Sequence, residues 1–161
     1  MTPEARARKI ESYGNAFTQL SDAVVAFPAK MWTYSPGADR WSIQEIVFHL
    51  ADSEAHGFIR CRTAIAEPGK PVMVYDQIKW TQHLNYDNRS VKDALELFRL
   101  LRKSSYELIK SLPDSAWTQT MNHSERGLLT LDDWLDMYEG HVTGHITQMN
   151  RVYEDWKKSG E

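Results

Sequence analysis

Two histidines stand four residues apart near the end of the chain, at His141 and His145. In an α-helix this spacing puts both imidazole rings on one face, about 5.4 Å apart along the axis, so that they can bind one metal ion together. Both also fall inside an apolar stripe, between Tyr138 and Met149, and therefore point toward the core. Burying an imidazole without a partner costs about 1 to 3 kcal/mol. Two explanations remain open: the rings bind a metal ion, or they are hydrogen-bonded in the core.

A metal site needs a third ligand, and His49 is the candidate. It stands in another predicted helix, on an ideal wheel roughly 60° beyond Ile46, from where it can reach a groove between helices. Three neutral imidazoles suit one divalent ion such as Zn or Ni, with Fe or Mn as alternatives, and they leave coordination positions open for water or substrate. Such a site is catalytic in type rather than structural. We interpret His56, His83 and His123 as solvated histidines.

Two other residues with possible chemical roles have simpler explanations. Cys61 lies toward the apolar side of its predicted helix, which favours a plain core cysteine over a nucleophile. Glu45 could orient His49, but it follows Ser42 by three residues, and this spacing is typical of a helix capping box. We therefore expect no covalent nucleophile from the chain itself.

A further candidate region is the segment 67–89, which carries two prolines, a glycine and several aromatic residues. It is too irregular for one long helix and too apolar for a flexible linker, so we expect an ordered crossover with a short helix around 76–82. Tyr75, Asp76 and Trp80 either line the mouth of a substrate pocket or simply pack against the bundle.

Four amphipathic helices are predicted to position the histidines. Each begins at a capping residue and carries apolar residues at helical spacing, and the four span 3–27, 43–66, 91–112 and 131–156. Residues 114–129 form either a loop or a small hairpin. The fold class is therefore all-α, a four-helix bundle with a longer crossover between helices two and three, which permits an order other than plain up-down.

Composition narrows the choice of partners. A chain of 161 residues suits a single domain over 1–161, and its apolar and charged fractions are those of a folded protein. The net charge of -3 and the scattered Lys and Arg residues argue against a nucleic-acid partner. No apolar run approaches membrane-spanning length, and a single cysteine fits a reducing compartment. We expect a cytoplasmic protein without a membrane partner, and a homodimer is one option for its oligomeric state.

Several segments together resemble a known family, the DinB-like metal-binding four-helix bundles. Within it they resemble the YfiT type, described as bacillithiol transferases or predicted metal-dependent hydrolases. The segments are Trp41-Ser42-Ile43-Gln44-Glu45-Ile46-Val47-Phe48-His49-Leu50-Ala51-Asp52-Ser53, Ile59-Arg60, Tyr75-Asp76 with Trp80, and His141-Val142-Thr143-Gly144-His145-Ile146.

This resemblance implies a three-histidine site of His49, His141 and His145, in agreement with the helical spacing. Relatives often carry additional histidines where this chain has Phe48, Glu54 and Gly140, so the surroundings of the site differ and with them the choice of metal or substrate.

The leading hypothesis is a metal-dependent enzyme acting on a small molecule. A divalent ion lowers the pKa of a coordinated thiol or water near neutral pH. In one version a low-molecular-weight thiol, bacillithiol-like, is transferred to an electrophilic small molecule, as in detoxification; in the other, water attacks an ester or amide. A second hypothesis is a non-catalytic, stress-related metal-binding and interaction module, and a third is a structural bundle whose histidines are only hydrogen-bonded.

Overall fold

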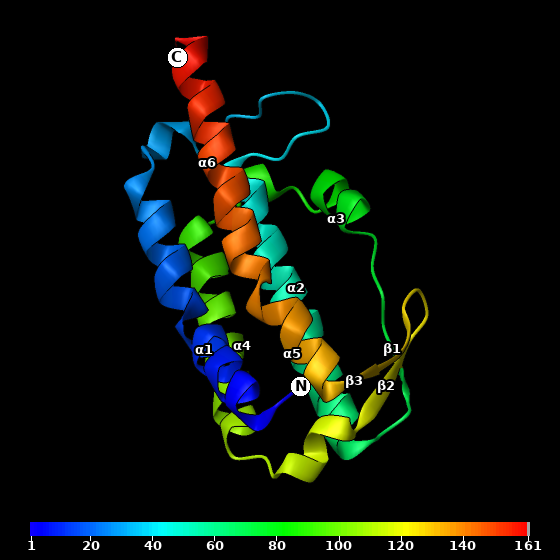
Figure 1. Cartoon of the computed structure of the whole chain (residues 1–161). Helices are drawn as coiled ribbons and strands as arrows, with labels where there is room; N and C mark the ends of the chain where they lie inside the picture. Colours follow the sequence, from blue (N-terminus) through cyan, green and yellow to red (C-terminus); the bar gives the residue numbers. More distant parts are fainter. Residues whose placement is uncertain (161) are drawn as a thin grey trace.

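The computed structural model describes residues 1–160, and four long helices form a bundle (Figure 1). The first three are α1 (Pro3–Ala26), α2 (Ile43–Ala66) and α4 (Val91–Lys110), and the fourth is divided into α5 (Leu131–Glu139) and α6 (His141–Ser159). The smaller elements are α3 (Gln77–His83), β1 (Pro71–Val72), β2 (Thr120–His123), β3 (Gly127–Thr130) and 3₁₀ turns at Ala29–Met31, Tyr86–Asn88 and Asp114–Thr118. The predicted all-α four-helix bundle is confirmed.

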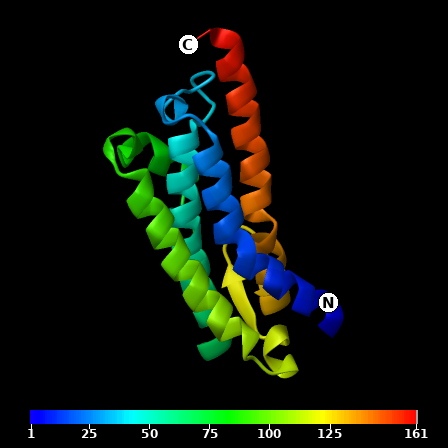
Figure 2. The same ribbon diagram turned by 90° about the vertical axis from the view of Figure 1, so that its left-hand side faces the viewer.

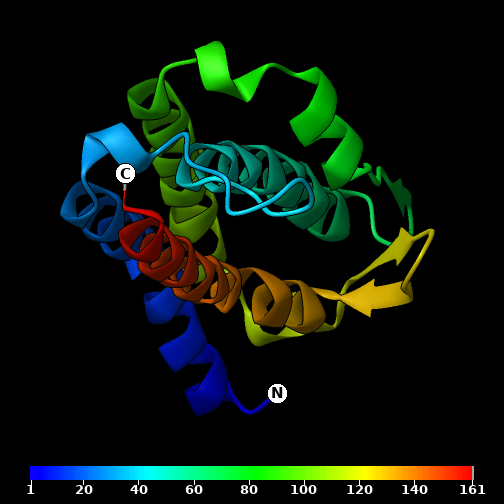
Figure 3. The same cartoon turned by 90° about the horizontal axis from the view of Figure 1, so that it is seen from above.

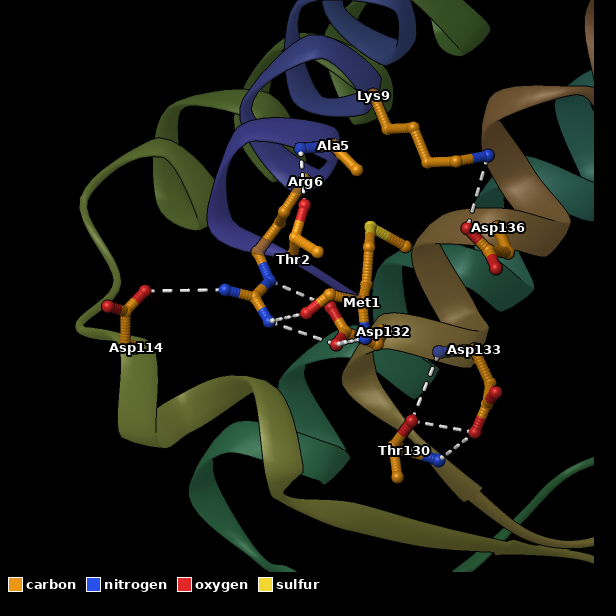
Figure 4. Close-up of polar contacts among 10 residues, drawn as sticks. All are labelled: Met1, Thr2, Ala5, Arg6, Lys9, Asp114, Thr130, Asp132, Asp133 and Asp136. Atoms are coloured by element: carbon orange, nitrogen blue, oxygen red, sulfur yellow. Dashed lines mark hydrogen bonds and ion pairs between the residues drawn. The ribbon is translucent and has the colours of Figure 1, made fainter.

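The long helices begin where the capping residues predict. The Ser42 hydroxyl accepts from the backbone N–H of Glu45, and the Glu45 carboxylate accepts from the N–H of Ser42, which completes a capping box at α2. Thr130 and Asp133 form the equivalent box at α5 (Figure 4). Thr2 caps the first turn of α1. These bonds satisfy backbone donors that a helix N-terminus otherwise leaves free.

The bundle does not follow a plain up-down order. In Figures 1 and 2, α1 and α6 run toward one end of the bundle, whereas α2 and α4 both run toward the other. α2 packs against α4 and against α5 and α6, and α1 packs against α4, α5 and α6. Since α2 and α4 are parallel neighbours, the chain must return along the whole bundle between them. The segment 67–90 makes this return, as the predicted crossover requires.

The crossover is attached to a hairpin that lies far away in sequence. The strands β2 and β3 pair antiparallel, so the hairpin alternative for residues 114–129 is correct. β1 then adds to β2 in parallel, with Val72 opposite His123. Seen from above, α3 and the hairpin lie on the same side of the bundle, outside α2 and α5 (Figure 3). The sequence pattern did not predict this pairing between crossover and hairpin.

Two apolar clusters fill the bundle, and a polar layer separates them along the helices. One cluster includes Leu20, Leu50 and Phe98, and the other includes Cys61, Ile109 and Trp134. Between them along α2 and α4 lie the buried side chains of Glu54, Arg102 and Ser105. We call Glu54, Arg102, Ser105 and the Tyr13 hydroxyl the polar layer.

The fourth helix is not continuous, which corrects the prediction of one helix over 131–156. It is interrupted at Gly140, so that α6 begins at His141. The Tyr138 carbonyl accepts a hydrogen bond from the Arg102 guanidinium at 3.3 Å. The fourth helix is therefore interrupted next to the point where Arg102 of α4 donates a hydrogen bond to its backbone. In the part of the chain described, 1–160, no helix combines the length and apolarity needed to cross a bilayer.

Candidate metal centre

Three histidines from two helices meet at one point of the bundle. His49 lies on α2 and is 3% exposed, while His141 and His145 lie on the first two turns of α6. The Nε2 atom of His141 lies 3.3 Å from Nε2 of His49 and 3.1 Å from Nε2 of His145. One ligand nitrogen from each ring lies within 4.8 Å of the other two. The structure thus brings together the three histidines that the sequence singled out.

The distances between these nitrogens match those around a metal ion. Ligand nitrogens about 2.0 to 2.1 Å from an ion, at angles between octahedral and tetrahedral, lie about 2.9 to 3.4 Å from one another. The separations of His141 from His49 and from His145 fall within this range, and the nitrogens of His49 and His145 lie within 4.8 Å of each other. The set therefore has the donor chemistry and the spacing for one divalent ion, with positions left for further ligands.

Hydrogen bonds between the rings account for the arrangement less well. The Nδ1 atom of His145 lies 2.9 Å from the Oε1 of Gln148, which can only accept, so Nδ1 carries the proton and Nε2 of the neutral ring carries a lone pair. Nε2 of His141 can then donate to His145, but it has no lone pair left for His49. The contact between His141 and His49 would thus lack a hydrogen bond. A metal ion, in contrast, accepts one lone pair from each of the three rings.

The surroundings keep the rings neutral, as metal binding requires. Burial lowers the pKa of His49 to about 2, assisted by His145 and His141. Burial also lowers the pKa of His141 to about 3, with contributions from His145 and from the positive charge of Arg102. Neutral imidazole is the form that offers a lone pair to an ion.

Trp41 packs against two of the three rings. Its ring centroid lies 4.8 Å from that of His49 and 6.3 Å from that of His145, and the latter pair is stacked within 17°. Trp41 does not border the cavity described next, whereas His49 and His141 do. His49 and His141 therefore connect the histidine set to the cavity, where an ion held by the three rings would be reached by a ligand.

The cavity beside the histidines has a volume of about 770 Å³, which is sufficient for a small-molecule ligand. Its walls come from α2, the crossover, α3, the hairpin, α5 and α6. The lining residues are His49, Ser53, Arg60, Val74, Tyr75, Asp76, Gln77, Ile78, His123, Glu125, Arg126, Met137, Tyr138 and His141.

The three crossover residues that we expected at a pocket border two different cavities. Tyr75 and Asp76 line the large cavity, but Trp80 borders a smaller neighbouring cavity of about 200 Å³. Asp76 also caps α3, because its carboxylate accepts from the N–H groups of Ile78 and Lys79. The predicted short helix around 76–82 is thus present, and its capping residue borders the cavity.

Two histidines interpreted as solvated are buried instead. His56 stacks on Tyr75 with centroids 4.1 Å apart, and His123 is 4% exposed on β2 in the wall of the cavity. His56 is covered by the crossover, and His123 lies on the strand that pairs with it. Neither packing follows from local periodicity, because both depend on the pairing of crossover and hairpin. His83 is exposed, as expected.

The pairing of the crossover with the hairpin also explains why the sequence does not predict other residues that line the cavity. Arg60 appeared only within the family resemblance, and Arg126 and Tyr138 were not assigned to the site. Arg60 donates to the Tyr138 hydroxyl at 3.1 Å and to the Met73 carbonyl at 2.7 Å, and both interactions depend on the folded crossover and α5. The sequence does carry one signal for Arg60. It stands eleven residues after His49, and this spacing puts both side chains on the same face of the helix.

Behind the histidines, the polar layer ties the helices together. Arg102 donates to Glu54 at 2.6 Å, and the second carboxylate oxygen of Glu54 accepts from the Tyr13 hydroxyl. Arg102 also donates to the Tyr138 carbonyl, three residues before His141. Glu54 and Arg102 thus form a buried ion pair behind the histidines.

The remaining candidate groups have structural roles. Cys61 is fully buried, and burial raises the pKa of its thiol to about 12, so the expectation of a core cysteine is confirmed. Glu45 completes the capping box of α2 as expected.

Comparison with known proteins gives relatives of one kind. A predicted metal-dependent hydrolase of Oceanobacillus iheyensis is 26% identical over 118 residues, covering 72% of this chain and 68% of the relative. YfiT of Bacillus subtilis, also described as a predicted metal-dependent hydrolase, is 25% identical over 115 residues, covering 69% of this chain and 65% of the relative. The matched part thus spans about two thirds of the relatives' length.

Solved structures extend the likeness of fold. A structure of YfiT from Bacillus subtilis, described as a probable metal-dependent hydrolase with an unusual four-helix bundle topology, superposes with a TM-score of 0.90 at 20% identity over 98% of this chain and 90% of that chain. A variant of a mycothiol-dependent maleylpyruvate isomerase superposes with a TM-score of 0.73 at 10% identity, covering 92% and 63%. The profile of the DinB superfamily matches residues 14–149, most of the chain, and the protein therefore belongs to the DinB superfamily.

Proposed function

We propose that the protein is a metal-dependent enzyme that transfers a low-molecular-weight thiol to an electrophilic small molecule. The observation that carries this proposal is the convergence of His49, His141 and His145 at one end of a cavity of small-molecule size. The ion is Zn or Ni, with Fe or Mn as alternatives, because neutral imidazoles bind these divalent ions. When bound, it lowers the pKa of a thiol that enters an open coordination position.

The chain's own residues hold and expose this centre. Gln148 fixes the ring of His145 so that Nε2 faces the other two histidines. Trp41 packs against His49 and His145, and His49 and His141 border the cavity, through which we expect a ligand to approach. Tyr75 and Tyr138 provide aromatic walls there for the second substrate.

Thiol transfer is favoured over hydrolysis by one comparison. Cys61 is buried, so in either reaction we expect the nucleophile to come from a ligand rather than from a cysteine of the described residues. Among proteins with the same fold, the maleylpyruvate isomerase is described as mycothiol-dependent, so the bundle can serve thiol chemistry. Hydrolysis stays a second candidate, because the relatives are described as predicted metal-dependent hydrolases.

The proposal is tested with metal-loaded protein, a panel of small thiols and a chlorodinitrobenzene acceptor. The carbon–sulfur bond forms, the carbon–chlorine bond breaks, chloride leaves and the thiol proton passes to solvent. We expect turnover that requires the metal and falls at least about a hundredfold in His145→Ala, because the ion is lost. An exposed histidine provides the matched control, and His83→Ala should retain full activity.

A nitrophenyl ester serves as the hydrolytic substrate in the same assay. Turnover of the ester without any thiol-dependent product would replace thiol transfer by hydrolysis. If metal-loaded protein turns over neither substrate class, the enzyme proposal is wrong.

A further inference from the structure

The cavity is lined along α2 by residues from His49 of the histidine set to Arg60. His49, Ser53 and Arg60 all line it from this helix. Eleven residues separate His49 from Arg60, which corresponds to about 16 Å of helix and returns the side chain to the same face within about 20°. A ligand that reaches the histidines can therefore extend toward Arg60.

Arg60 is a buried cation without a carboxylate partner. Only 9% of the surface of Arg60 is exposed. Nε and Nη2 donate to the Met73 carbonyl at 3.2 and 2.7 Å, and Nη1 donates to the Tyr138 hydroxyl at 3.1 Å. Within residues 1–160, no carboxylate oxygen lies within the 4.0 Å of an ion pair with Arg60. A guanidinium has five N–H donors, so two are left for a ligand.

The hairpin adds further cationic and donor groups to the same wall. Arg126 reaches over α5, with Nη1 3.5 Å from the sulfur of Met137, and His123 lies buried beside it. Burial lowers the pKa of His123, and the charges of Arg60 and Arg126 lower it further, against an opposing effect of Glu125. Both arginines therefore act on one place in the cavity.

The acidic residues of the cavity do not neutralise Arg60. Asp76 is engaged in capping α3 and forms an ion pair with Lys79 at 3.6 Å. Glu125 is exposed at the tip of the hairpin. A buried charge is unfavourable unless a counter-charge accompanies it, so an anion entering beside Arg60 would supply the missing partner.

We propose that Arg60, together with Arg126 and His123, binds the carboxylate of a substrate whose reacting thiol lies at the His49 end of the cavity. This inference rests on the proposed function and narrows its substrate class to thiols that carry a carboxylate. Arg60 acts as the anchor, because it is held rigidly by Met73 and Tyr138 while its two free N–H groups remain available.

The test compares two thiols that differ only at the end remote from sulfur, mercaptohexanoate and mercaptohexanol. Both are titrated into the Co²⁺-loaded protein, and binding is followed by the sulfur-to-cobalt absorption. We expect mercaptohexanoate to bind at least about tenfold more tightly, because a charge-assisted hydrogen bond forms at Arg60. In Arg60→Gln this preference should fall below about threefold, while the affinity for mercaptohexanol stays unchanged.

Additional variants guard against misfolding and general charge effects. Arg126→Gln alters an exposed side chain and should reduce the preference partly, and Arg60→Lys should retain part of it. Arg151→Gln removes the same charge from an exposed position on α6 outside the cavity and should change nothing. Equal affinity for both thiols in the unmodified protein, or an undiminished preference in Arg60→Gln, would overturn the carboxylate subsite.

A second measurement separates this inference from the proposed function. Hexanoate is titrated into metal-free protein while the Nε–H resonance of Arg60 is followed by NMR, with hexanol as control. If Co²⁺ does not bind, the proposed function fails, but a shift of this resonance with hexanoate alone would still support the subsite. Absence of any shift would refute it.

Discussion

Arg102 donates to Glu54 across 2.6 Å in the centre of the bundle, and the side chain of each is only 1% exposed. The pair links α4 to α2, and the same guanidinium bonds the backbone carbonyls of Tyr13 and Tyr138. It thus connects all four long helices at the level of the candidate metal centre. Removing one member leaves a buried charge without its partner.

The Arg102→Ala variant should lose about 3 to 5 kcal/mol of unfolding free energy, because Glu54 is then buried without a counter-charge. Urea denaturation followed by circular dichroism measures the loss. A double variant, Glu54→Met with Arg102→Met, should be less destabilised than Arg102→Ala, since neither charge remains. The matched control is Arg99→Ala on the same helix, whose ion pair with Glu96 is exposed to solvent, so its removal should change the unfolding free energy far less. Equal losses in Arg102→Ala and Arg99→Ala would contradict the structural role of the buried pair.

Gly57→Ala should destabilise the protein by about 1 to 3 kcal/mol, because a Cβ at this position would lie 2.5 Å from the ring of Tyr138. Tyr138 cannot easily move, since its hydroxyl is bonded to Arg60. Thermal unfolding measures the effect. Gly144→Ala is the control: it lies between the two histidines of α6, has no atom within 4 Å of the added Cβ, and should be neutral or slightly stabilising. A stable Gly57→Ala protein would show that the contact with Tyr138 is looser than described.

Cys61 should not react with a thiol reagent such as dithiobisnitrobenzoate in the folded protein at pH 8. Burial raises the pKa of its thiol to about 12, so only about one molecule in ten thousand carries the thiolate, and the side chain is inaccessible as well. In denaturant the same reagent should modify one thiol per chain. Fast modification of the native protein would place Cys61 nearer to the surface and reopen its role as a nucleophile.

Asp132→Asn should lower the unfolding free energy by about 1 to 3 kcal/mol near neutral pH, since it breaks a two-pronged ion pair with Arg6 (Figure 4). The hydrogen bond from Arg6 holds the pKa of Asp132 below its usual 3.8. Between the lowered pKa and 3.8, Asp132 stays ionised in the folded protein but takes up a proton in the unfolded chain. The stabilisation by the ion pair is therefore fully present above pH 3.8 and is lost as the pH falls through the lowered pKa of Asp132. Urea titrations of both proteins over a range of pH should show their difference shrinking below pH 4. A difference that is constant with pH would exclude this ionic contribution.

The sequence predicts the helices well because their signals are local. Ser42 with Glu45 and Thr130 with Asp133 mark helix starts through bonds that span three residues, and apolar spacing then gives the buried faces. The pair His141 and His145 is equally local, which is why it was visible at once. His49 required a judgement on which helix packs beside α6, and the bundle supplies that contact.

The cavity could not be predicted in this way, because it depends on contacts between distant segments. Val72 pairs with His123 across about fifty residues, and this pairing buries His123 and completes the wall of the cavity beside Arg60. The break at Gly140 also escaped the periodicity, since Arg102 stabilises the free carbonyl of Tyr138 from another helix. Both features are set by tertiary structure rather than by local sequence preferences.

The central claim is tested most directly by measuring bound metal in protein purified without an affinity tag. Elemental analysis after exposure to Zn²⁺ or Ni²⁺ and removal of the excess should find about one ion per chain, together with a rise in the temperature of unfolding. His141→Ala should retain less than about a tenth of an ion, whereas His83→Ala should match the unmodified protein. Less than about a tenth of an ion in the unmodified protein, without thermal stabilisation by either metal, would contradict the three-histidine centre.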